Sequence, residues 1–203
     1  MLDRRPEPMS VAAFFAWQEA QAERYELVDG VPVRMMAGAR NVHDDIVVNL
    51  VATLRTQLRG SGCRVFTRDG AIIAGPDQVR RPDVGVACGA RDPDRAWAAD
   101  PRLVIEVMAS RVSDDDAFRK LDVYQRTAGI VDVLLIEPNV PAVLLWTRDA
   151  AGGWIMGGVD GLDASIRLTS IDLVLPLAAI FDGVIFPERP WEVVAEPASD
   201  LKT

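Results

Sequence analysis

The sequence predicts one domain of the α/β (α+β) class, in which a mixed β-sheet is flanked by helices. Short apolar runs typical of β-strands alternate with two or three helix-like segments, and this interleaving favours a sheet covered by helices. The chain has 203 residues, 49% hydrophobic and 26% charged, a composition typical of a globular domain. We expect the domain to cover residues 10–186, between a loose arm at 1–9 and an acidic tail at 187–203.

The first half of the chain predicts two helices, a hairpin and several strands. Ser10 is a favourable N-cap for a helix that we expect to continue to Arg24. Asp29-Gly30 separates two strand-like runs and predicts a hairpin turn. Apolar residues spaced by three and four positions predict a second helix, which Gly60 ends. The hairpin strands are expected at 25–28 and 31–35, the second helix at 43–59, and further strands at 64–68, 71–74 and 79–88.

The second half begins with a loop rich in Gly, Pro and Asp and continues with an apolar strand. The helix that follows has three aspartates in its first turn, where the helix dipole favours negative charge. Three more strand-like runs and one helical turn complete the domain. The loop is expected at 89–101, the first strand at 102–108, the helix at 113–127, the later strands at 131–136, 142–147 and 154–159, and the helical turn at 176–181.

The composition excludes several classes of protein. No apolar run reaches the roughly 18 residues of a transmembrane helix, and the N-terminus lacks the apolar core of a secretory signal, so we expect a cytoplasmic protein without a membrane partner. Cys63 and Cys88 belong to no Cys/His cluster and are expected to be free thiols. With His43 as the single histidine, a zinc site is close to excluded.

A Ser-His-Asp hydrolase is also disfavoured, because no GxSxG segment accompanies His43. Metal chemistry would therefore have to depend on carboxylates. Oxygen ligands of this kind favour Mg²⁺ or Mn²⁺.

Glu106 and Asp83 are the carboxylates that need an explanation. Glu106 interrupts an apolar run, and strand alternation places it on the face of Val104 and Met108. A buried carboxylate is costly unless it finds a cation. Asp83 follows Pro82 at the entry of another apolar run and could place a second carboxylate on the same cation. The alternatives are a solvent-reaching or arginine-paired glutamate and an ordinary Pro-Asp turn.

The helix after Glu106 supplies a possible third group. Asp116, Lys120 and Tyr124 are spaced by four and share one helix face. Lys120 is the only lysine in the body of the domain, and a lysine near a metal-bound water can stabilise charge that develops on a phosphate. An ordinary surface Asp–Lys pair is the alternative, and Tyr124 can equally be an aromatic residue at the edge of the core.

The motifs occur in a recognisable order. They are Arg24–Gly30, His43 before an apolar helix, Arg81–Val84, Asp100–Val107, and then Asp116, Lys120 and Tyr124. This ordered set resembles the Uma-two family, restriction-endonuclease-like proteins of the PD-(D/E)XK nuclease superfamily, over residues 9–181.

The resemblance implies a restriction-endonuclease-like core and Mg²⁺- or Mn²⁺-dependent hydrolysis of DNA phosphodiesters. It assigns Asp83 and Glu106 as catalytic metal ligands and Lys120 as the catalytic lysine. Glu26 would be a further metal ligand or lie next to one, and His43 a phosphate contact or proton shuttle. Asp116 and Tyr124 would be supporting residues, and superfamily members often form the homodimer that we also expect here.

The sequence departs from the family pattern at two places. The lysine of the superfamily normally lies two residues after the acid, where this chain has Met108, so Lys120 would have to reach back into the site from the helix. The segment 109–112 reads Ala-Ser-Arg-Val, whereas the family usually has Ser-Pro-Ser-Thr.

The charge of the chain limits how tightly it can bind DNA. The formal net charge is −8, whereas affinity for nucleic acid depends largely on Lys and Arg that neutralise phosphates. Residues 55–81 nevertheless hold six arginines and two aspartates. Arg80 and Arg81 are either a solvated basic edge or contacts to DNA phosphates. We therefore expect modest affinity for DNA.

Three functional hypotheses follow. The first is a metal-dependent endonuclease that uses Asp83, Glu106 and Lys120. The second is a catalytically silent nuclease-like fold that serves protein interaction or dimerisation. The third is a hydrolase of another phosphorylated substrate.

Overall fold

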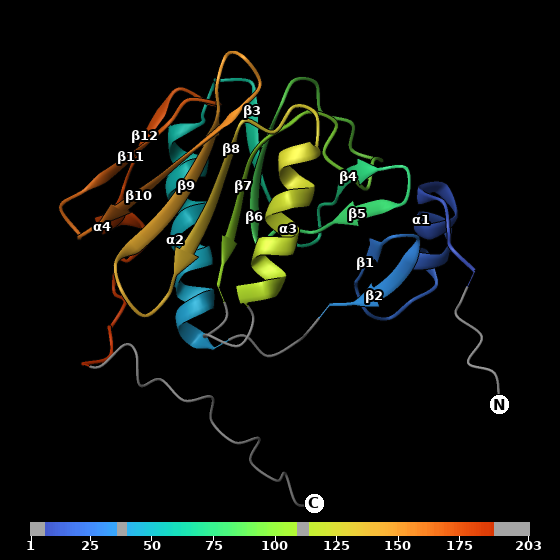
Figure 1. Cartoon of the computed structure of the whole chain (residues 1–203), viewed down its shortest axis with the longest axis horizontal. Coiled ribbons are helices and arrows are strands. Elements are labelled where there is room, and N and C mark those ends of the chain that lie inside the picture. Colours follow the sequence, from blue (N-terminus) through green and yellow to red (C-terminus); the bar gives the residue numbers. More distant parts are fainter. Residues whose placement is uncertain (1–6, 36–39, 109–113, 189–203) are drawn as a thin grey trace, which may run out of the picture.

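A six-stranded mixed sheet forms the centre of the fold (Figure 1). The computed structural model describes residues 7–35, 40–108 and 114–188, without the side chains of 114–117. In the described sheet, β7 and β8 are parallel and the other neighbours are antiparallel, which confirms the α+β class with a mixed sheet. The strand order is β10 (Trp154–Asp160), β9 (Ala142–Arg148), β8 (Asp132–Glu137), β7 (Pro101–Val107), β6 (Val84–Cys88) and β3 (Cys63–Thr67).

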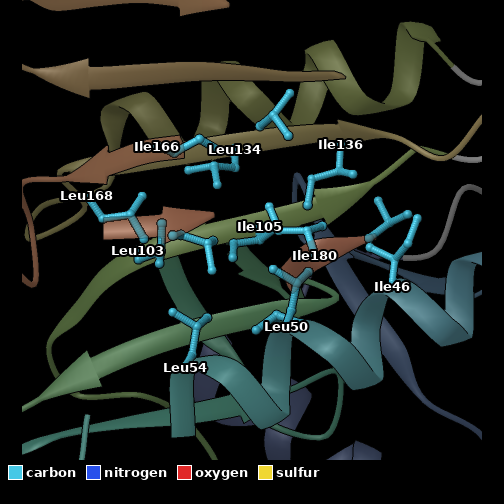
Figure 2. Close-up of a cluster of buried hydrophobic side chains, with 14 of the residues drawn as sticks. Ile46, Leu50, Leu54, Leu103, Ile105, Leu134, Ile136, Ile166, Leu168 and Ile180 are labelled. Atoms are coloured by element: carbon cyan, nitrogen blue, oxygen red, sulfur yellow. The ribbon is translucent and has the colours of Figure 1, made fainter. Parts of the chain in front are cut away.

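Helices cover both faces of this sheet, and each buries its own core. Helix α2 (Asn41–Gln57) lies on one face, where Ile46, Leu50 and Leu54 recur every four residues and point at the sheet (Figure 2). The short α4 (Leu177–Ile180) packs against α2 on that side, as do residues of the two-stranded sheet of β11 (Ser165–Leu168) and β12 (Leu173–Pro176). Helix α3 (Asp114–Arg126) covers the opposite face.

Strand β7 separates the two cores, since its residues are buried on both faces. Ile105 and Val107 pack in the α2 core, and Val104 packs with Tyr124 in the α3 core. Glu106 alternates with Ile105 and Val107 and therefore faces α3, as the sequence predicted. A fully buried strand of this kind reads as a nearly continuous apolar run.

A second sheet lies beside the first and carries part of the candidate site. Its strand order is β2 (Val31–Arg34), β1 (Tyr25–Val28), β5 (Gln78–Arg80) and β4 (Ile72–Gly75), and α1 (Val11–Glu19) packs against β1. The predicted hairpin is confirmed: β1 and β2 pair around Asp29 and Gly30, with φ of 49° and 76°. Positive φ at both turn residues is what a two-residue hairpin turn requires.

The structure differs from the sequence-based expectation in three respects. The strand expected at 79–88 is two strands, β5 and β6, because Arg81–Asp83 crosses from one sheet to the other and Pro82 has no N–H for a ladder. Helix α1 ends at Glu19 because the amide of Gln18 bonds the carbonyl of Glu23 and the N–H of Tyr25, which turns the chain toward β1. Strands β11 and β12 were not expected.

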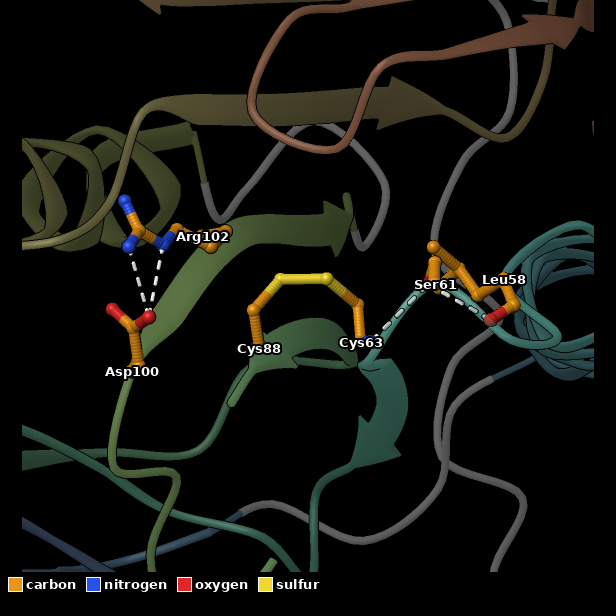
Figure 3. The surroundings of a disulfide bond; sticks show 6 residues. All are labelled: Leu58, Ser61, Cys63, Cys88, Asp100 and Arg102. Atoms are coloured by element: carbon orange, nitrogen blue, oxygen red, sulfur yellow. Dashed lines mark hydrogen bonds and ion pairs between the residues drawn. A yellow bond between two sulfur atoms is a disulfide. The ribbon is translucent and has the colours of Figure 1, made fainter. Parts of the chain in front are cut away.

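The prediction of free thiols is wrong. Cys63 and Cys88 form a disulfide between β3 and β6 (Figure 3). The antiparallel register places the two residues directly opposite each other. The pairing of strands 25 positions apart is a tertiary feature that cysteine spacing alone does not reveal.

Some expectations lie outside what the structure tests. Most of the N-terminal arm and most of the acidic tail lie outside the described residues. All four positions of the turn 109–112 also lie outside them. The division into arm, domain and tail therefore stays a prediction. Within the described residues, no helix is both long and apolar enough to cross a membrane.

Candidate active site

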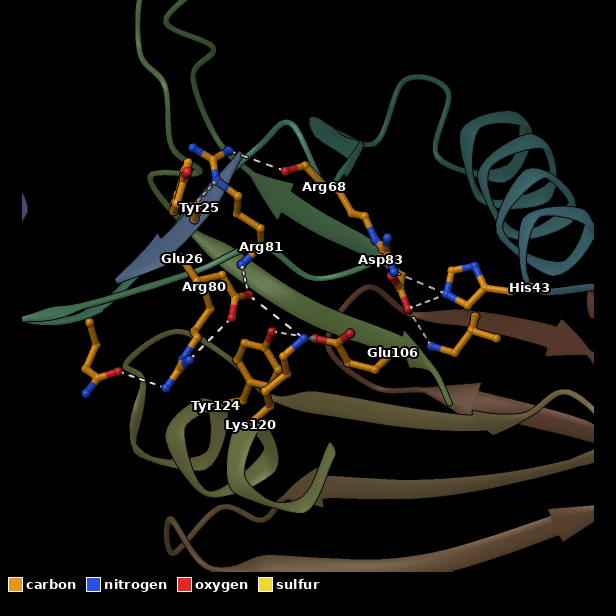
Figure 4. Close-up of polar contacts among 12 residues, drawn as sticks. Tyr25, Glu26, His43, Arg68, Arg80, Arg81, Asp83, Glu106, Lys120 and Tyr124 are labelled. Atoms are coloured by element: carbon orange, nitrogen blue, oxygen red, sulfur yellow. Dashed lines mark hydrogen bonds and ion pairs between the residues drawn. The ribbon is translucent and has the colours of Figure 1, made fainter. Parts of the chain in front are cut away.

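The candidate site lies where the two larger sheets meet (Figure 4). In the antiparallel pair of β6 and β7, Val84 lies opposite Ile105, so Asp83 comes opposite Glu106. The link Arg81–Asp83 connects β5 of the second sheet to β6, and Glu26 lies on the neighbouring β1. Strand pairing, rather than proximity in sequence, thus brings the three predicted carboxylates into one region.

Asp83 is held by three donors from three different segments. Its Oδ2 accepts the backbone N–H of Val107 at 2.8 Å and lies 3.1 Å from His43 Nε2. Its Oδ1 accepts Arg68 Nε at 2.6 Å. Burial acts to raise the pKa of the Asp83 carboxyl, but the hydrogen bond of His43, the charge of Arg68 and the N–H of Val107 together lower it below its ordinary value.

His43 therefore has a defined position in the structure. It lies in the first turn of α2, is 8% exposed, and contacts Asp83 from the side of the sheet covered by that helix. The contact orients the aspartate. A phosphate contact or a proton shuttle at His43 stays a prediction.

Glu106 is buried and faces α3. Tyr124 donates its hydroxyl to Glu106 Oε1 at 2.6 Å, and Lys120 Nζ lies 3.6 Å from the same oxygen. Burial raises the pKa of Glu106 to about 7; Lys120 and Tyr124 oppose this rise, and the nearby carboxylates of Asp83 and Glu26 add to it. A carboxyl group so close to its midpoint near neutral pH is typical of functional sites.

Lys120 reaches the site from α3. Besides Glu106, its Nζ lies 3.9 Å from Glu26 Oε1, and its side chain is 18% exposed. Lys120 thus reaches from α3 toward Glu106 of β7, as the sequence required with Met108 at the usual position of the superfamily's lysine. Tyr124, one helical turn later, is fully buried, and its pKa is raised well above the ordinary value by burial and by Glu106. The side chain of Asp116 lies outside the described residues.

Glu26 is bound by two consecutive arginines. Its Oε1 accepts the backbone N–H of Arg81 at 2.8 Å, and its Oε2 lies 3.4 Å from Arg80 Nη1. The guanidinium of Arg81 donates to the carbonyls of Tyr25 and Asp69. Arg80 and Arg81 are 6% and 3% exposed, so the reading of a solvated basic edge is wrong: both side chains stabilise the junction between the sheets. A contact of either residue with DNA stays a prediction.

Arg68 is the site residue that sequence reasoning missed. It directly follows β3, and because Thr67 lies opposite Val84, Arg68 comes opposite Asp83. In the sequence it was only one of six arginines in a basic segment. The signal that identifies it is the pairing of β3 with β6, which local patterns do not contain.

Two of the three predicted metal ligands, Asp83 and Glu106, have the chemistry to hold one divalent cation. Asp83 and Glu106 come opposite each other on neighbouring strands, and the charge of Asp83 acts on the Glu106 carboxyl. Mg²⁺ is commonly held by one or two carboxylates together with waters and phosphate oxygens. Among the described residues, no three His, Cys, Asp or Glu side chains converge as a ready-made metal site. Metal ligation by Glu26, whose oxygens contact Arg80 and Arg81, stays a prediction.

Comparisons with known proteins agree with this fold. The chain is 28% identical over 180 residues to an uncharacterized protein of Synechocystis sp., covering 88% of this chain and 94% of the relative. A crystal structure titled as a "putative nuclease belonging to DUF820" from Anabaena variabilis superposes with a TM-score of 0.69. That match has 18% identity and covers 88% of this chain and all of the other, so it shows a shared fold.

Residues 11–178 match the Uma2 family, whose description is "Putative restriction endonuclease". The match covers most of the chain and includes every residue of the site described above. The resemblance inferred from the motifs is thereby confirmed, and the chain belongs to the Uma2 family.

Proposed function

We propose that the protein is a metal-dependent nuclease that hydrolyses phosphodiester bonds of DNA, with Mg²⁺ or Mn²⁺ as cofactor. One observation carries the proposal. Lys120 Nζ lies 3.6 Å from Glu106, and Glu106 lies opposite Asp83 on the neighbouring strand. The ammonium group of Lys120 and the carboxylates of Glu106 and Asp83 therefore occupy one largely buried region.

Asp83 and Glu106 would hold the cation. When bound, such an ion supplies a more acidic water and polarises the phosphoryl oxygen. The hydrogen bonds of Val107 and His43 hold the Asp83 carboxylate in one orientation, and the hydroxyl of Tyr124 does so for Glu106. Positioning of this kind matters because ligand geometry must be fixed before the reaction begins.

Lys120 is the proposed catalytic lysine. Its ammonium group lies between Glu106 and Glu26, and these two carboxylates attract it into the site. A fixed positive charge there can stabilise the negative charge that develops on the phosphate in the transition state. Glu26, itself held by Arg80 and Arg81, is a positioning residue for Lys120.

Cleavage of supercoiled plasmid DNA in Mn²⁺ tests the proposal. The wild type should nick or linearise the plasmid. Glu106→Gln should lower the cleavage rate at least 100-fold, because removal of one group that stabilises transition-state charge typically lowers a rate by about 10²–10³. Glu137→Gln is the matched control, because Glu137 ends the neighbouring strand β8 but bonds Asn139 instead of the site. Equal cleavage by the wild type and Glu106→Gln would refute the site assignment.

A catalytically silent, nuclease-like interaction module is the second candidate. It is favoured by the partners that the carboxylates already have: Asp83 contacts Arg68 and His43, and Glu26 contacts Arg80 and Arg81. This candidate predicts that Mn²⁺ leaves the melting temperature of the wild type unchanged. A nuclease with the proposed cation site should melt at a higher temperature in Mn²⁺, and Asp83→Asn should abolish that increase.

The proposal includes a homodimer formed through strand β10. This strand is an edge of the six-stranded sheet, and its Ile155 and Met156 are 62% and 63% exposed. The strand contains no Pro, and its one charged residue, Asp160, is the last; an edge strand with exposed apolar side chains readily pairs with another strand. The two tryptophans of this hairpin do not supply the proposed contact: Trp146 is buried, and the indole of Trp154 donates to the carbonyl of Gln125.

A further inference from the structure

The two oxygens of Asp83 are held in different ways. Oδ2 is bound by the backbone N–H of Val107 and by His43, both of which belong to the packed interior. Oδ1 is bound by the guanidinium of Arg68, whose Nη2 also lies 3.3 Å from His43 Nε2. Loss of the Arg68 contact would therefore leave the carboxylate in its present orientation, with one oxygen available to another cation.

Arg68 is placed so that its side chain can leave. Its side chain is 43% exposed, whereas that of Asp83 is 2% exposed, so the guanidinium reaches the aspartate from the surface. It follows β3, an edge strand of the sheet, and its backbone carbonyl accepts a hydrogen bond from Arg81 Nη1 at 3.3 Å. The backbone is thus anchored, while the side chain can change rotamer without opening the core.

A divalent cation at Asp83 and Glu106 would change the balance of charge around Arg68. In the present structure, each carboxylate of the site has a basic partner: Arg68 at Asp83, Lys120 at Glu106 and Arg80 at Glu26. Two additional positive charges next to Asp83 would repel Arg68, which is the most exposed of the three basic partners and so the one with room to move into solvent. A freed guanidinium beside a metal-bound phosphate has the planar, two-pronged geometry that phosphate recognition uses.

We propose that Arg68 is an exchangeable counter-ion: it occupies Asp83 in the cation-free protein and transfers to a phosphate of the DNA when the metal binds. The inference depends on the proposed nuclease function. It makes Arg68 an antagonist of metal binding and, in the metal-loaded protein, a residue that contacts the substrate.

Binding measurements on Arg68→Gln test this exchange, because the two binding steps should change in opposite directions. By isothermal titration calorimetry without DNA, the variant should bind Mn²⁺ about 3- to 10-fold more tightly than the wild type, since no guanidinium has to be displaced. In Ca²⁺, its affinity for a 20-base-pair duplex should fall about 10-fold with the loss of one charged phosphate contact. A purely structural role of Arg68 would weaken both steps.

Two further variants complete the experiment. Arg64→Gln removes an arginine from the same strand, and should leave Mn²⁺ affinity unchanged while weakening DNA binding less. Arg68→Lys retains the positive charge but lacks the planar guanidinium, and it should show smaller changes in both Mn²⁺ affinity and DNA affinity. This variant provides the test if Arg68→Gln does not fold. If Arg68→Gln and Arg68→Lys bind Mn²⁺ no more tightly than the wild type, the exchange is wrong but the proposed function stands. If neither the wild type nor any variant binds Mn²⁺, both the exchange and the proposed function are wrong.

Discussion

At the scale of the residue, Glu106 links the stability of the protein to its chemistry. Its carboxyl group is buried beside Asp83 and Glu26, and its folded-state pKa is about 7 against an ordinary 4.5. The folded protein therefore retains a proton that the unfolded chain releases. Without metal, deprotonation of Glu106 opposes folding, whereas a bound cation would favour the same deprotonation.

This linkage predicts a pH dependence with a defined sign. Between about pH 4.5 and 7 the unfolded chain binds fewer protons at Glu106 than the folded protein, so this group's contribution to the free energy of unfolding falls as the pH rises. Relative to Glu106→Gln, the wild type should lose roughly 1–3 kcal/mol between pH 5 and 8. Urea denaturation of both proteins in EDTA at several pH values measures the difference. A constant difference across that range would show that Glu106 titrates normally.

Much of the residue-level site could be predicted, for identifiable reasons. Glu106 was conspicuous because a charged residue interrupts an apolar strand, and Lys120 because lysine is rare in this chain. Arg68 and the binding of Glu26 by Arg80 and Arg81 could not be predicted, because they depend on which strands pair. Non-local pairing is a tertiary property that periodicity does not report.

At the scale of the element, the pair of β3 and β6 connects the disulfide with the site. The disulfide Cys63–Cys88 closes one end of this ladder, and Arg68 and Asp83 meet at the other. Between them, Gly85 lies under the ring of Phe66: a Cβ at Gly85 would be 2.3 Å from Phe66 Cζ. The close contact explains why the strand carries glycine in an otherwise apolar run.

Reduction of the disulfide should destabilise the protein. The bond closes a loop of 25 positions, and loops of that size are worth about 2–4 kcal/mol through their effect on the unfolded chain. The urea midpoint should fall in dithiothreitol, and the double variant Cys63→Ser/Cys88→Ser should already have the lower midpoint and no response to the reductant. Two reactive thiols in the untreated, denatured wild type would show that the bond does not form.

Element boundaries were predictable where local chemistry sets them. The Asp29-Gly30 turn defined the hairpin, and the four-residue spacing of Ile46, Leu50 and Leu54 defined α2. The split between β5 and β6 was not predicted, because β5 has only one apolar residue, Val79, and its pairing in a different sheet is a tertiary feature. The short strands β11 and β12 pair with each other but were not predicted: β11 has only two apolar residues, and β12 runs directly into the helical turn α4.

At the scale of the whole molecule, the acidic charge and the exposed edge strand bear on the proposed DNA substrate and the proposed dimer. The net charge of −8 disfavours non-specific DNA binding, so in the proposed function the basic side chains nearest the site would have to supply the phosphate contacts. The exposed edge of β10 is the separate surface proposed for a second copy of the chain.

Charges on the edge strand should prevent dimerisation. The double variant Ile155→Lys/Met156→Lys places lysine on both faces of β10, and lysine at an edge strand is an established obstacle to strand pairing. Multi-angle light scattering at about 10 µM, a concentration at which interfaces of ordinary size are populated, should give a dimer for the wild type and a monomer for the variant. Val174→Lys, exposed on β12, should remain dimeric. A monomeric wild type would refute the dimer.

In the proposed function, Asp83 and Glu106 share one divalent cation. Anomalous diffraction from a crystal grown with Mn²⁺ tests it most directly. We predict a peak bonded to both carboxylates, at about the 2.0–2.2 Å typical of small divalent cations with oxygen ligands, and a guanidinium of Arg68 that no longer contacts Asp83. A crystal saturated with Mn²⁺ that shows no peak between the two carboxylates, with Arg68 still on Asp83, would contradict the account.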